Sequence, residues 1–157
     1  MKVAIVAAAA GLASLSLAGA AGAVGYKLSP PSTKFTGTGP TSATTTSGVS
    51  LSCTAKFKGS TNKTGIGKIT SGSFTGALGC TGVTLGNLPW KAEALTATTG
   101  EILDVEFDSP IGNCGPGTVP ATISGAGVIS FNTSALKGCS SVSGTITTTP
   151  EVTIVPK

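Results

Sequence analysis

The chain has 157 residues, with ten Lys against six acidic residues and neither Arg nor His. Without His there is no imidazole base, no His metal ligand and no His-based triad, and without Arg there is no bidentate clamp for phosphate. The net charge of +4 is spread over Lys residues that form no block, which argues against nucleic acid as a partner.

The N-terminus has the three parts of a secretory signal. A positive charge at Lys2 precedes an Ala-rich apolar stretch, Val3–Leu17, and small residues then offer A-x-A cleavage after Ala20 or Ala23. We expect residues 1–23 to be removed, leaving no transmembrane anchor and a secreted, extracellular protein, with the periplasm or cell surface as the alternative. The uncharged run is long enough to span a bilayer, so a retained anchor is the rival interpretation.

The first part of the mature chain is polar. Residues 24–48 are rich in Pro, Thr and Ser, which predicts an N-terminal arm with one short strand at about 34–38. From Val49 to Phe57 apolar residues then alternate with Ser, Thr and Lys, a pattern typical of a strand with one buried face. A turn near Asn62 leads to a second strand, where Gly65 and Gly67 predict a bulge.

Seven further apolar runs predict short strands separated by Gly, Pro and Asn turns. They are Val83–Leu85, Trp90–Ala94, Leu103–Phe107, Val119–Ile123, Ile129–Phe131, Val142–Ile146 and Val152–Ile154. Nine or ten short strands favour an all-β fold, and we expect a disulfide-braced antiparallel β-sandwich over 49–157 rather than a barrel.

The four cysteines, Cys53, Cys80, Cys114 and Cys139, lie 25 to 34 residues apart without a C-x-x-C pair. Zinc is therefore not expected, and an even number of cysteines behind a secretory signal predicts two disulfides in an oxidising compartment. We expect neither a metal nor a cofactor.

Two stretches of the chain echo one another. "GIGKI" at 65–69 and "GAGVI" at 125–129 share the pattern G-x-G-x-I, and they lead to "ALGC" and "ALKGC". We interpret the echo as evidence for two related halves. The alternative is that a common turn-and-strand sequence pattern arose twice by convergence. Of the three possible pairings, the echo selects Cys53–Cys80 and Cys114–Cys139, one disulfide inside each half.

Four of the six acidic residues fall in "EILDVEFD", 101–108. Three carboxylates, Asp104, Glu106 and Asp108, alternate with Leu103, Val105 and Phe107, so we expect one acidic and one apolar strand face. A solvated face is the favoured interpretation. Calcium or glycan contact is an alternative, and catalysis is disfavoured because the pattern offers no buried pocket to raise a carboxyl pKa.

Trp90 is the single Trp. It is expected to be a core residue, with an exposed stacking platform for sugar or hydrocarbon as the alternative. Asn62 and Asn132 begin N-glycosylation sequons, which have meaning only in a glycosylating host.

Four stretches together resemble a known family: "VSLSCTAKFKG", "GNLPW", "NCGPGTVPATISG" and "TTTPEVTIV". Their order is similar to that in small secreted bacterial activators of alkane oxidation, and the likeness runs from about Leu28 to Val155 with all four cysteines. The resemblance implies an exported, non-catalytic protein that aids contact with hydrocarbons and is linked to extracellular matrix and biofilm. The family has no catalytic motif to carry over.

The alternative function is a glycan-binding or adhesin-type surface subunit, assisted by calcium at the acidic face and by Trp90. An enzyme is the least favoured class. The expected partners are a hydrocarbon or matrix surface and further copies of the chain, because the terminal strand "EVTIV" can pair within the chain or with a neighbour.

Overall fold

A computed structural model describes residues 25–134 and 136–157, so the expected signal and its cleavage sites lie outside the described residues. In this part of the chain there are eleven strands, one 3₁₀ turn and no α-helix. The elements are β1 (Tyr26–Ser29), β2 (Lys34–Thr45), β3 (Ser50–Thr61), β4 (Gly67–Gly76), η1 (Cys80–Gly82), β5 (Thr84–Gly86), β6 (Trp90–Ala94), β7 (Thr99–Ser109), β8 (Gly112–Ile123), β9 (Val128–Thr133), β10 (Cys139–Thr149) and β11 (Thr153–Pro156). None of the described residues belongs to a helix long and apolar enough to cross a membrane.

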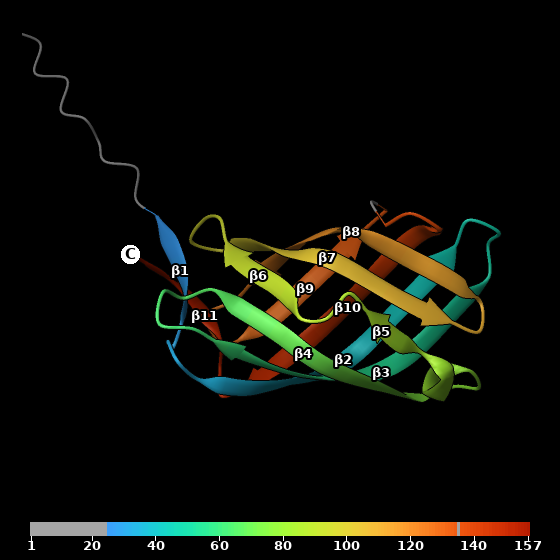
Figure 1. The fold of residues 1–157 in the computed structure, drawn as a ribbon, viewed down its shortest axis with the longest axis horizontal. Coiled ribbons are helices and arrows are strands. Elements are labelled where there is room, and N and C mark those ends of the chain that lie inside the picture. The colour runs from blue at the N-terminus through green and yellow to red at the C-terminus, as the bar shows by residue number, and fades with distance from the viewer. Residues whose placement is uncertain (1–24, 135) are drawn as a thin grey trace, which may run out of the picture.

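The long strands form one antiparallel sheet that closes on itself (Figure 1). Following the hydrogen bonds, the order is β7-β6-β4-β3-β2-β10-β9-β8, and β8 then pairs with β7. The short strand β5 pairs with the far half of β7, beyond the part that pairs with β6. The result is an eight-stranded barrel.

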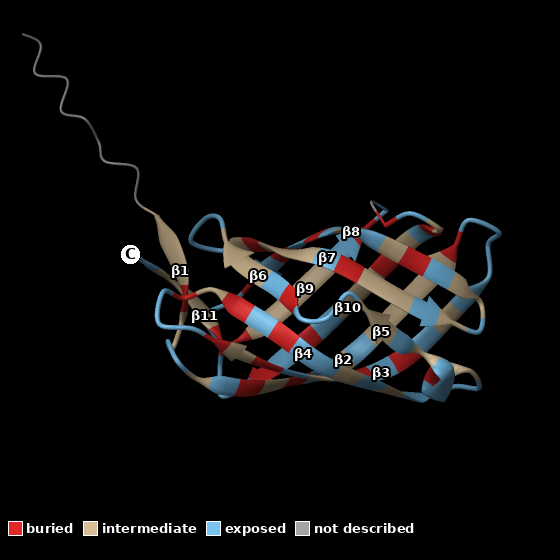
Figure 2. Cartoon of the chain, in the orientation of Figure 1, coloured by how far each residue is buried: buried red, intermediate tan, exposed pale blue. Residues whose placement is uncertain are grey.

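The expected sandwich is therefore wrong, although the all-β class and the two disulfides are confirmed. Strands of a sandwich and of a barrel both have one inner and one outer face, so alternation along a strand suits either architecture. Figure 2 shows that alternation of buried and exposed positions along the wall strands. The feature that distinguishes the barrel from a sandwich is the pairing of β7 with β8, which closes the sheet. The alternation of apolar residues along the sequence does not reveal this pairing.

The segment expected to be a polar arm is part of the wall. Residues Lys34–Thr45 form β2, which pairs with β3 along nearly its whole length and with β10 on its other side. Its inward positions include Gly37, Thr41 and Ala43, which line the interior. The short strand expected at about 34–38 is the first part of β2. Small and hydroxylated residues at the later inner positions hid the rest of the strand from a search for alternating large apolar residues.

A two-stranded sheet covers one end of the barrel (Figure 1). There β1 pairs with β11, so the C-terminal strand finds its partner within the chain. Leu28, next to Gly65, forms a buried cluster with Phe35, Ile123 and Val152. This cluster closes that end of the interior.

Two disulfides mark the other end. Cys53 pairs with Cys80 and Cys114 pairs with Cys139, the two pairs that the internal echo selects. Each joins the first strand of a β-hairpin to the residues that follow its second strand: β3 to η1 after the β3–β4 hairpin, and β8 to the first residue of β10 after the β8–β9 hairpin. Leu136 packs beside Cys114 and Cys139 and is almost completely buried.

The two hairpins also have the same turn. The side-chain oxygen of Asn62 accepts hydrogen bonds from the amides two and four residues later, and that of Ser124 does the same. Gly65 and Gly127 occupy equivalent left-handed positions, with φ of 76° and 70°. The turns therefore align Gly65 with Gly127, two residues away from Gly125, which the sequence echo had matched to it.

The bulge expected beside Gly67 lies slightly further along β4. The register against β3 shifts where Lys58 pairs with Ser71 and Gly59 pairs with Ile69, which leaves Thr70 as the additional residue. The sequence therefore placed the irregularity on the correct strand.

Candidate functional site

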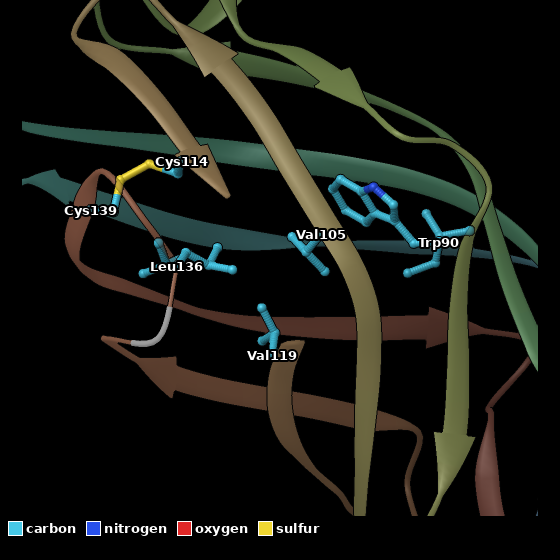
Figure 3. Close-up of a cluster of buried hydrophobic side chains, with 8 residues drawn as sticks. Trp90, Val105, Cys114, Val119, Leu136 and Cys139 are labelled. Atoms are coloured by element: carbon cyan, nitrogen blue, oxygen red, sulfur yellow. A yellow bond between two sulfur atoms is a disulfide. The ribbon is translucent and has the colours of Figure 1, made fainter. Parts of the chain in front are cut away.

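The interior of the barrel is the best-formed site in the described part of the chain. It contains a cavity of about 100 Å³ to which every wall strand contributes. The large residues that line it include Phe35, Phe57, Trp90, Val105, Phe107 and Phe131. Figure 3 shows Trp90, Val105 and Val119 directed into this common space, with the Cys114–Cys139 disulfide and Leu136 toward one end.

The polar groups of the cavity wall are already bonded to the protein. Thr41 Oγ1 donates to the carbonyl of Cys53 at 3.1 Å. Thr148 Oγ1 donates to the carbonyl of Gly127 at 2.8 Å and accepts from the amide of Val152 at 2.8 Å. Among the described residues, every buried side-chain nitrogen or oxygen has a partner. The cavity thus offers a ligand apolar surface and no free hydrogen-bonding group, the kind of cavity that stays dry and takes apolar guests.

The interior is not filled by its own side chains. Phe57, Leu85, Ile102, Phe107 and Phe131 all line the cavity, yet each is only partly buried. Part of their accessible apolar surface therefore faces the cavity. A barrel of eight strands is at the size where side chains either fill the interior or leave room for one small ligand, and this one leaves room.

Trp90 is a wall residue of this interior. It is 4% exposed, its Nε1 donates to the carbonyl of Gly86 at 2.7 Å, and its ring centroid lies 6.3 Å from that of Phe57. The alternative of an exposed stacking platform is therefore wrong. Its hydrogen bond also fixes the loop between β5 and β6.

The acidic run lies on the outer surface. Asp104 and Asp108 are exposed and Glu106 is half-buried, on the opposite side of β7 from Val105 and Phe107. The expected apolar partner Leu103 does not line the cavity, and Ile102 takes that place. The reason is a bulge. Asp104 has a left-handed φ of 59°, and the register against β8 shifts between Ile102 and Val105.

The carboxylates form no cation site in the structure. Within residues 25–134 and 136–157, no three Asp, Glu or Cys residues come together in a way that could hold a metal ion. Glu93 forms an ion pair with Lys91 on β6 and faces Glu101 on β7. The two sequon asparagines are both exposed, and Asn62 uses its side chain to build the β3–β4 turn.

Sequence reasoning missed the cavity itself. Its wall combines large residues such as Trp90 and Phe131 with small ones such as Gly37 and Ala43, and these come from different strands. A linear pattern does not contain that information, because it depends on which strands become neighbours around the barrel. The one signal in the sequence for an unfilled interior was the number of Gly, Ala and Thr residues at alternating positions.

The chain belongs to the family described as alkane oxidation protein activator PraA/PraB-like, whose family model matches residues 1–156. The resemblance seen in the sequence is thereby confirmed. No curated protein and no solved structure matches the chain.

Proposed function

We propose that this protein is an exported, non-catalytic accessory protein that promotes the use of alkanes by holding the end of a hydrocarbon chain inside its barrel. The observation that carries this proposal is the apolar cavity of about 100 Å³, whose two lining hydroxyls, those of Thr41 and Thr148, are already bonded to the protein. A site without free donors or acceptors selects for saturated carbon, and the family description names alkane oxidation.

The size of the cavity sets what it can hold. An engineered apolar cavity of about 150 Å³ takes one benzene molecule, so about 100 Å³ accommodates a few carbons of a chain and not a long alkane. Each methylene group that leaves water contributes about 0.8 kcal/mol, which is a factor of about four in the dissociation constant. Affinity should therefore rise with chain length by that factor and level off once the cavity is full.

Export and the absence of catalysis are parts of the same proposal. Two disulfides suit an oxidising compartment, and the N-terminal sequence has the pattern of a secretory signal. The cavity wall has no acid, base or nucleophile, and the acidic side chains of β7 lie on the other face of the strand. Such an interior can bind a chain but has no group with which to react.

The test is uptake of propane, n-butane, n-pentane and n-hexane from the vapour phase, measured by headspace gas chromatography with and without protein. Methyl NMR of Ile69, Val142 and Ile146 reports whether the alkane reaches the interior, since all three line the cavity. We expect saturable uptake with about a fourfold gain per added carbon at the short end of the series. Uptake that is unsaturable and leaves these methyl signals unshifted would contradict the proposal.

A filling variant and a matched control make the test specific. Ala43 lines the cavity, and Ala43→Leu adds three carbons to that space. Ala97 lies in an exposed turn, so Ala97→Leu makes the same chemical change away from the cavity. We expect Ala43→Leu to abolish uptake of hexane and Ala97→Leu to leave it unchanged, with amide spectra confirming that both variants fold.

Association with matrix or biofilm is included in the proposal as a consequence of export. It is tested by locating the protein in pellicles grown on hexadecane and on succinate. A glycan-binding role gains no support from Trp90, which is buried. Binding to a glycan panel with and without calcium would establish that alternative instead.

A further inference from the structure

The two disulfide-closed hairpins differ in how far their strands pair. In the first, β3 and β4 pair over nine residue pairs, from Cys53–Gly76 to Thr61–Gly67. In the second, β8 and β9 pair only at Thr122–Ser130 and Ile123–Ile129, next to the turn. The same plan therefore gives one hairpin that is paired throughout and one whose strands separate.

The separation of β8 from β9 is bounded at both ends. The turn and its two residue pairs close one end. At the other end, the Cys114–Cys139 disulfide joins β8 to the first residue of β10, and the amide of Gly115 donates to the carbonyl of Lys137, in the connection between β9 and β10, at 2.8 Å. Between these points β8 pairs only with β7 and β9 pairs only with β10. The barrel wall thus has a gap of fixed length.

Pro120 explains where the gap begins. The amide of Ile123 donates to the carbonyl of Thr98 on the β7 side at 2.8 Å. Alternate residues of a strand direct their backbone groups to opposite sides, so Thr122 and Pro120 face β9. Thr122 pairs with Ser130, but Pro120 has no N–H to offer the next position. The ladder therefore ends at this proline.

An open groove of about 760 Å³ lies on the outer surface along this gap. Its walls come from β2, β8, β9 and β10 and from Leu95, Thr99 and Gly100, and none of its lining residues is Lys, Asp or Glu. Its polar side chains are uncharged: the amide of Asn132 and hydroxyls that include those of Thr122 and Ser130. Phe131 lines both this groove and the interior cavity, so at this residue only the barrel wall lies between the two spaces.

We propose that the gap between β8 and β9 is the mouth of the cavity, and that groove and cavity together bind a neutral amphiphile with one unbranched apolar chain. The end of the chain occupies the interior and an uncharged hydroxylated end remains in the groove. The inference rests on the proposed function, because it requires that the interior accepts carbon chains. A long-chain primary alcohol has this chemistry, and it is also the compound that hydroxylation of an alkane at its terminal carbon produces.

Two features favour an amphiphile over a free alkane. The cavity of about 100 Å³ holds only part of a chain, so the remainder must pass through the mouth and lie in the groove. The groove supplies hydroxyls and an amide for a polar end, but no cation that would compensate a carboxylate for the water it loses. The preferred head is therefore neutral.

The first experiment compares n-octane, 1-octanol and octanoate by NMR titration of the oxidised protein. We expect 1-octanol to bind at least tenfold more tightly than octanoate and to shift the amide signals of Ser130 and Asn132 as well as the methyl signals of Ile146. Octane should shift the Ile146 methyl signals and should shift the two groove amides less than 1-octanol does, because it has no hydroxyl to bond in the groove. If octane binds and 1-octanol neither gains affinity nor shifts the groove amides further than octane does, the amphiphile is wrong while the proposed function stands. If no ligand shifts the interior methyls, both fail.

The second experiment tests the mouth through the rate of uptake. Pro120→Thr restores the missing donor opposite Asn132, so the ladder can extend and the gap should close. We expect exchange of 1-octanol to slow at least tenfold in this variant. Pro31→Thr, a change at an exposed proline in the turn before β2, should leave the rate unaltered.

A second pair of variants keeps the test decisive if Pro120→Thr does not fold. Ser130→Trp places a large ring over the groove from an outward position of β9, and Thr54→Trp places the same ring on an outward position of β3 in the fully paired hairpin. We expect slow uptake in Ser130→Trp and unchanged uptake in Thr54→Trp. Equal rates in both would place the mouth elsewhere and overturn the proposal.

Discussion

The two disulfides should be equivalent for global stability and different for local stability. Cys114–Cys139 spans 25 residues and Cys53–Cys80 spans 27. In the chain-entropy model, loops of these lengths stabilise by about 3.5 kcal/mol each at 25 °C. All four cysteines are almost completely buried, so replacement by Ala adds a small and similar void term in both cases. We expect each double Ala variant to lose about 3.5–5 kcal/mol in the free energy of unfolding.

The local effect follows from the unequal pairing of the hairpins. Without Cys53–Cys80, β3 and β4 are still joined by nine residue pairs. Without Cys114–Cys139, the far ends of β8 and β9 keep only the hydrogen bond from Gly115 to Lys137 and the packing of Leu136. The segment around Leu136 should therefore open in Cys114→Ala/Cys139→Ala, and no comparable segment should open in Cys53→Ala/Cys80→Ala.

Urea unfolding and amide hydrogen exchange separate the two effects. With an m-value of about 1–3 kcal/mol/M, a loss of about 3.5 kcal/mol lowers the urea midpoint by roughly 1–3.5 M in both variants. In Cys114→Ala/Cys139→Ala, hydrogen exchange at the backbone amides of residues 115 and 139 should accelerate by at least ten times more than the loss of global stability predicts. Equal local protection of these amides in the two variants would refute the reasoning that β8 and β9 depend on the disulfide for closure.

Three further outcomes follow from single positions. Trp90→Phe should lower stability by about 1–3 kcal/mol in thermal unfolding, because the partly buried carbonyl of Gly86 loses its donor. Asp104→Val should cost roughly 1–2 kcal/mol and Asp104→Asn nearly nothing in the same assay, since φ of 59° tolerates Asn and disfavours a β-branched residue. In Gly144→Ala the new Cβ would lie 2.5 Å from Phe131 Cζ, so we expect the ring signals of Phe131 to shift in NMR and stability to fall by about 1–3 kcal/mol.

The strand β3 shows what the sequence could predict. Apolar residues at 49–57 alternate strictly with polar ones, and the observed strand, Ser50–Thr61, buries Cys53 and Ala55 on the expected face. Alternation of apolar and polar residues predicts a strand wherever the inward residues are large and apolar. The alternation therefore located most wall strands, but it missed the second half of β2, the first half of β8 and the phase of β7.

The phase of β7 shows why local alternation was insufficient. A search for period two places Leu103 with Val105 and Phe107, but the left-handed Asp104 inserts a bulge, and Ile102 becomes the inward residue. Asp is one of the few residues that enter the left-handed region readily. Its presence at position 104 is therefore compatible with a bulge but does not predict one. Closure of the sheet and the size of the interior depend on strand neighbours, which no single-strand pattern contains.

The prolines of β8 explain why two hairpins of one design differ. Both have the same turn, stabilised by Asn62 or Ser124, and both are closed at the far end by a disulfide. No proline interrupts β3, and its ladder with β4 is continuous apart from one bulge. In β8, Pro120 stands where the ladder with β9 stops, although the disulfide further on still holds the strands in one wall. A gap that is opened by a residue without a donor and bounded by a covalent bond keeps its length while the fold is intact. That is the property a mouth for a flexible chain requires, and it makes Pro120 the residue whose replacement should separate binding from access.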